Sequence, residues 1–77
     1  MLWAKKMRLP KLLDVVALLE DLPARGLVRG QVGTIVEAPG PDVFEVEFSG
    51  NDGRTYASLA LESRQFLVLQ HEVVAAD

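Results

Sequence analysis

The sequence predicts a small all-β domain, and three features support that prediction. Short runs of β-favouring residues are separated by glycine- and proline-containing turns at intervals of about 8–12 residues, which is typical of a small barrel or sandwich. Residues 43–48 alternate between apolar and acidic positions, as in a strand with one buried face. The chain has 77 residues, 49% of them hydrophobic and 25% charged, which fits one folded domain with a thin core.

The first apolar segment, residues 12–22, fits either a helix or a strand. Its large apolar residues recur at helical spacing, and periodicity alone slightly favours a helix. The adjacent β-branched residues Val15 and Val16, and the shortness of the apolar run, instead fit a buried strand. In both cases the segment ends before Pro23, because a residue that precedes proline is disfavoured in the α region.

The rest of the chain is predicted to form four further strands. Residues 31–37 form one, with Gly33 at a bulge or at a close approach of another strand. Residues 43–48 place their aromatic and valine side chains on one face and Glu45 and Glu47 on the other. The other two strands are residues 54–61 and the short closing strand 66–69. Glycines mark the turns, and Pro39 followed by Gly40 predicts a type II turn. The glycines to which we assign structural roles are Gly30, Gly33, Gly40 and Gly53.

Composition excludes several classes of site. The absence of cysteine removes disulfides, thiolate nucleophiles and cysteine-ligated zinc, and the single histidine, His71, is too few for a histidine-based metal site. The basic start of the chain resembles a signal peptide, but Asp14 interrupts the apolar run and acidic residues follow it where a cleavage site should stand. No segment reaches the roughly 18–20 apolar residues that a membrane span needs. We therefore expect a cytoplasmic protein.

Four segments occur in a fixed order along the chain: 14–23 (DVVALLEDLP), 29–37 (RGQVGTIVE), 43–48 (VFEVEF) and 52–57 (DGRTYA). With this set the chain resembles a small bacterial family, the domain of unknown function numbered 4926, from about residue 12 to residue 69. The resemblance implies a small SH3-like five-stranded antiparallel barrel whose first apolar segment is a strand, and this implication overrules the helical preference. It implies no activity or site residues.

No part of the sequence strongly indicates a catalytic or metal-binding site. Glu45 and Glu47 share a strand face and could form a carboxylate pair, but a solvated face is the simpler interpretation. Serines and His71 could form a hydrolytic triad on paper, although no nucleophile elbow supports it. We predict no catalytic residues, no cofactor and no metal. The exposed pair Arg54 and Tyr56 is a candidate interface anchor. The full set of interface candidates is Trp3, Leu9, Leu18, Arg54, Tyr56 and Val68.

Charge is distributed unevenly along the chain. Residues 1–11 hold four of the eight basic residues and none of the eleven acidic ones, so they carry +4 and residues 12–77 carry −7. We divide the chain into a basic arm (1–11), a barrel domain (12–69) and a tail (70–77). The net charge of −3 and a pI near 5.0 make nucleic acid an improbable partner.

The function that best fits these features is a non-catalytic protein-binding or assembly module. We expect it to self-associate as a homo-oligomer, because the chain holds more large apolar side chains than so small a core can bury. One alternative is a nucleic-acid-associated barrel of the KOW type, acting through Arg25, Arg29 and the basic arm. The other is an accessory or antitoxin-like partner of a basic protein.

Overall fold

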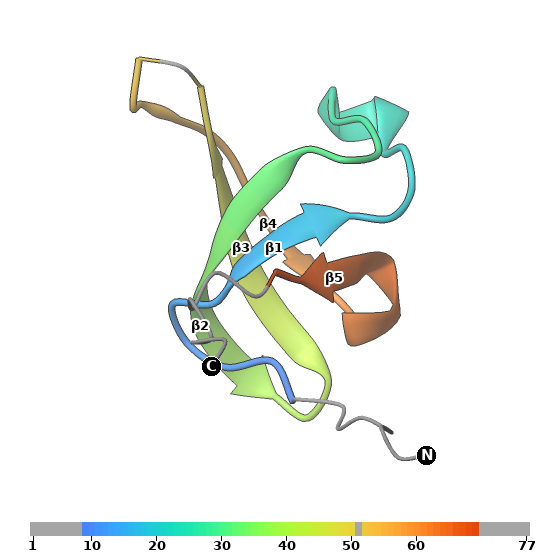
Figure 1. Cartoon of the computed structure of the whole chain (residues 1–77), viewed down its shortest axis with the longest axis vertical. Helices are drawn as coiled ribbons and strands as arrows, with labels where there is room; N and C mark the ends of the chain where they lie inside the picture. The colour runs from blue at the N-terminus through green and yellow to red at the C-terminus, as the bar shows by residue number, and fades with distance from the viewer. Residues whose placement is uncertain (1–8, 51, 70–77) are drawn as a thin grey trace, which may run out of the picture.

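In the computed structural model, which describes residues 9–50 and 52–69, the backbone forms one five-stranded antiparallel sheet. Across the sheet the strands lie in the order β4-β3-β2-β1-β5, so β5 returns to pair with β1 (Figure 1). The all-β prediction is confirmed. The outer strands β4 and β5 do not pair with each other, and the sheet is open between them. The strands are β1 (Val15–Leu18), β2 (Val32–Gly40), β3 (Val43–Ser49), β4 (Thr55–Leu61) and β5 (Phe66–Val68).

The first apolar segment contains a strand, and its helical periodicity is misleading. β1 is bonded on both sides, since Val16 stands opposite Gly33 of β2 and opposite Val68 of β5. Val16 and Leu18 are buried while their neighbours in the strand are only half-buried, which is the two-residue period of a strand. Pairing with two neighbouring strands satisfies the backbone of this β-branched segment without a helix.

Two 3₁₀ turns connect the strands. The first, η1 (Pro23–Arg25), begins with the proline that ends the first segment. The second, η2 (Ser63–Gln65), lies between β4 and β5, and it is closed by a capping box between Glu62 and Gln65. The backbone N–H of Glu62 donates to Oε1 of Gln65 at 2.8 Å. This turn leads the chain directly from β4 into β5.

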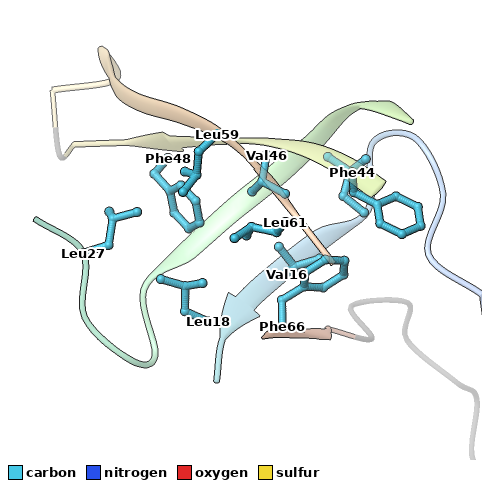
Figure 2. Close-up of a cluster of buried hydrophobic side chains, with 10 residues drawn as sticks. Val16, Leu18, Leu27, Phe44, Val46, Phe48, Leu59, Leu61 and Phe66 are labelled. Atoms are coloured by element: carbon cyan, nitrogen blue, oxygen red, sulfur yellow. The ribbon is translucent and has the colours of Figure 1, made fainter. Parts of the chain in front are cut away.

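The core lies inside the bend of the sheet. Side chains of β3 and β4 point toward those of β1 and β5, and Leu27 closes one end (Figure 2). Phe44 and Phe66 meet edge to face, with ring centroids 5.7 Å apart. Five strands therefore share one cluster of buried side chains: Val16, Leu18, Leu27, Ile35, Phe44, Val46, Phe48, Leu59, Leu61 and Phe66.

Gly33 lies where β2 and β3 approach each other closely. A Cβ atom at this position would stand 2.8 Å from the carbonyl oxygen of Glu47, 2.8 Å from Cγ1 of Val46 and 2.9 Å from Cδ2 of Phe48. Ile35, two residues further along β2, donates its backbone N–H to the carbonyl oxygen of Asp14 on the β1 side. Since residues two apart in a strand direct their backbone groups to the same side, those of Gly33 also point toward β1. Gly33 and its partner Phe48 therefore form a non-hydrogen-bonded pair, the narrower kind in an antiparallel ladder. The sequence prediction of a close approach matches this geometry.

The hairpin between β2 and β3 turns two residues later than the sequence predicts. Gly40 pairs with Val43 inside the ladder, so the expected Pro39-Gly40 turn is wrong. The loop consists of Pro41, which fixes its own φ, and Asp42, which takes the positive φ of 59°. Pro39 lies within the register shift between Glu37 and Gly40, where a strand tolerates a missing N–H. Gly30 and Gly53 do take positive φ in their turns.

Candidate interaction surface

The outer face of the sheet, opposite the core, carries a row of apolar side chains. Ala17 of β1 stands directly opposite Val32 of β2 on one side and opposite Leu67 of β5 on the other. Val15 and Leu19 continue this side of β1, because Val16 and Leu18 between them point into the core. We call Val15, Ala17, Leu19, Val32 and Leu67 the apolar face.

Large side chains of the apolar face are open to solvent. Leu19 is 49% exposed, Val32 is 50% exposed and Leu67 is 54% exposed. Cross-strand neighbours on one face of a sheet lie close enough to form a continuous surface. Scattered exposed apolar residues are ordinary, but a contiguous patch across three strands is typical of an interaction site.

Further across the sheet, the same outer face becomes acidic. The residue row that starts at Val15 continues through Thr34 to Glu47 of β3 and Ser58 of β4. Glu45 lies on the same side of β3 and its Oε2 accepts a hydrogen bond from Oγ of Ser58 at 2.9 Å. Glu37 stands opposite Glu45. The outer face is thus apolar over β5, β1 and the start of β2, and acidic over β3 and its neighbours.

The structure corrects one interface candidate and places two others. Leu18 is only 1% exposed, because it occupies an inward-facing position of β1, so it is a core residue and not a surface contact. Val68 is half-buried and packs against the same core. Leu9 is exposed and precedes the turn that leads into β1, where Leu12 and Leu13 are exposed as well.

The remaining candidates lie at the start of β4 or outside the described part of the chain. Arg54 is exposed just before β4 and forms a weak ion pair with Asp52 at 3.8 Å. Tyr56 belongs to β4, but its side chain is outside the description, and so is Trp3. The anchor pair of Arg54 and Tyr56 thus stays a prediction.

The structure describes only some of the groups considered for catalysis. The Ser58 hydroxyl is bonded to Glu45, and His71 lies outside the described residues. Within residues 9–50 and 52–69, no three acidic or histidine side chains gather as metal ligands would. None of the helices in that part of the chain is long and apolar enough to span a membrane.

Sequence reasoning missed Val32 and Leu67 as surface residues. Residues 15–19 are apolar at every position, so no alternation reveals which members of the run face outward. Once Val16 and Leu18 are known to be buried, the odd-numbered residues must face the other side. The pairing register then adds Val32 and Leu67, which no pattern within one segment can do.

Comparisons with known proteins return one family. A family model described as a domain of unknown function, DUF4926, matches residues 12–68. The match begins just before β1 and ends at the last residue of β5, so it spans the whole sheet. Neither the search of curated proteins nor the search of solved structures returned a match.

Proposed function

The chain belongs to the DUF4926 family, and we propose that its domain is a non-catalytic binding module that assembles with a second copy of itself. The observation that carries this proposal is the apolar face, where Val32, Ala17 and Leu67 form one uncovered row across three strands. Burial of apolar area is worth roughly 25 cal/mol per Å², so covering such a row favours association. A two-fold dimer would place the same face on both copies.

The SH3-like barrel is part of the same proposal. The return of β5 to pair with β1, and the bend of the sheet around one core, support such an arrangement. In that arrangement the apolar face lies on the outside of the barrel wall, where a partner can contact it, while the side chains on the inner side are buried in the core.

Polar substitutions on the apolar face should weaken association without unfolding the domain. The variant carrying both Val32→Ser and Leu67→Ser loses two exposed apolar side chains from one row, so we expect it to elute later and scatter light as a smaller species than the wild-type chain, whose monomer mass is 8.4 kDa. The wild-type chain should have at least twice that mass at micromolar concentration. Size-exclusion chromatography with light scattering measures both.

Val28→Ser is the matched control for this experiment. Val28 is 57% exposed, as open as Val32, but it lies in the loop before β2 and outside the apolar face. Its replacement should leave the mass of the wild-type assembly unchanged. If the double variant keeps the wild-type mass, the apolar face does not mediate association.

The nucleic-acid alternative makes a separate prediction. Residues 12–77 carry a net charge of −7, and Glu45 and Glu47 place part of this negative charge on the sheet, so phosphate backbones are repelled. Arg25, one of the two arginines considered for such a role, is exposed and donates to the carbonyl of Ser58 at 3.2 Å. We expect no binding of duplex DNA or RNA tighter than about micromolar at physiological salt in an anisotropy titration. Tighter, salt-sensitive binding would favour the KOW-type alternative.

A further inference from the structure

Strand β4 forms an open edge of the sheet, and its sequence lacks the usual protection. β4 is the last strand on its side and pairs only with β3. Its seven residues (TYASLAL) include no charged side chain and no proline, and the chain has no lysine after Lys11. Natural edge strands are commonly shortened, charged or interrupted by proline, because an unprotected edge pairs with other strands. β5 at the opposite edge has only three residues.

Some backbone N–H and C=O groups of β4 do not bond to β3, and the pattern of the ladder identifies them. The guanidinium of Arg25 donates to the carbonyl oxygen of Ser58, and Arg25 lies outside the sheet. The carbonyl of Ser58 therefore points away from β3. In an antiparallel ladder both backbone groups of one residue point the same way, and the direction alternates along the strand. The N–H and C=O groups of Ser58 and Ala60 thus face outward along this edge.

From this geometry we infer that β4 pairs with β4 of a second copy in an antiparallel, two-fold-symmetric ladder centred on Ser58. The inference goes beyond the proposed function, because β4 lies at the opposite side of the sheet from the apolar face and gives each copy a second contact with another copy. Ser58 is the midpoint of β4, so this register uses the full length of both strands. Each Ser58 would exchange two backbone hydrogen bonds with its symmetry mate, as directly opposed residues in a ladder do.

A second copy fits this edge better than an acidic peptide does. Ser58 and Ala60 are small and neutral, so identical strands meet without a like-charge pair across the axis. Glu45 and Glu47 lie on the neighbouring strand, opposite Ala60 and Ser58, and would repel acidic side chains brought to the edge. Arg25 is the competitor for the Ser58 carbonyl, because it must release that oxygen before the strands can pair.

Ser58→Pro tests the inference most simply. Proline lacks the outward N–H, and an edge strand tolerates it where that N–H does not bond to the sheet. We expect far-UV circular dichroism to stay that of the wild type while the mass by light scattering falls below that of the wild-type assembly. Arg25→Ala removes the competing donor and should tighten the dimer by about tenfold. A folded Ser58→Pro variant that keeps the wild-type mass would overturn the inference.

A charge pair across the axis provides a test in which the variants need no proline. Ser58→Glu should have a smaller mass than the wild-type assembly, because two carboxylates would oppose each other beside Glu45 and Glu47. An equimolar mixture of Ser58→Glu with Ser58→Lys should form a mixed dimer, because opposite charges then meet. Ser49→Glu is the control, since Ser49 is also exposed and adds the same charge on the inner strand β3. It should remain associated.

The outcomes separate this inference from the proposed function. If the wild-type chain is a monomer, both are wrong. If the wild-type chain associates, and the Ser58 variants associate equally well while the apolar-face double variant does not, the proposed function stands and edge pairing is overturned. A mixture of Ser58→Glu and Ser58→Lys that does not recover the wild-type mass would also overturn it. A smaller mass for each Ser58 variant alone, together with recovery in the mixture, is the expected result.

Discussion

Gly33→Val should destabilise the domain by more than about 3 kcal/mol, well above an ordinary point substitution. A Cβ atom at this position would stand 2.8 Å from the carbonyl oxygen of Glu47, and that oxygen belongs to the backbone of β3. Side chains can rotate away from a clash, but this oxygen can move only if the strand moves. A chain of this size has roughly 4–12 kcal/mol of total stability, so the variant should be close to unfolded at room temperature.

Urea or thermal denaturation followed by far-UV circular dichroism measures this effect. Gly40→Val is the matched control, since Gly40 lies in the same strand, has open space where a Cβ would be, and does not take a positive φ. We expect it to change stability by no more than about 0.5 kcal/mol. Equal effects at the two positions would show that the close contact between β2 and β3 is not what requires glycine.

Phe48→Ala should cost about 3–5 kcal/mol, as truncation of a fully buried aromatic residue usually does. Phe48 is 0% exposed and is the largest fully buried side chain in the described part of the protein. It stands opposite Gly33 on one side and Ala57 on the other, so two small residues leave room for its ring. Truncation would leave a cavity between strands whose backbones already pair and cannot close over it.

The same denaturation experiment tests this prediction, with Val28→Ala as the comparison. Val28 is exposed in a loop, and its truncation should change the free energy of unfolding by less than about 0.5 kcal/mol. A Phe48→Ala variant as stable as wild type would mean that the ring is not packed at the centre of the core.

Much of the fold follows from local sequence patterns. Residues 44–48 alternate strictly between apolar and acidic side chains, and all three of the predicted inward residues, Phe44, Val46 and Phe48, are buried in β3. The turn before β5 was predictable from its polar residues, and the side chains of Glu62 and Gln65 close it. These features depend on neighbours within a few positions, which is the range that a single sequence reports well.

The wrong predictions concern segments whose structure depends on contacts with residues distant in the sequence. The helical spacing of residues 12–22 competes with pairing to β2 and β5, and neither partner is visible within the segment. Leu18 was assigned to the surface because a uniformly apolar run does not show its inward side. The turn at Pro41 and Asp42 replaced the one at Gly40 because the β2–β3 ladder continues through Gly40. The apolar face likewise depends on the pairing register, which places Val32 and Leu67 on either side of Ala17.

The native mass of the wild-type chain tests the central claim most directly. Light scattering after size exclusion at micromolar concentration, repeated on dilution, reports whether the 8.4 kDa chain assembles with itself. An assembly module with an uncovered apolar face and an open β4 edge should give at least twice that mass and dissociate as it is diluted. A mass of 8.4 kDa at every concentration would contradict self-assembly.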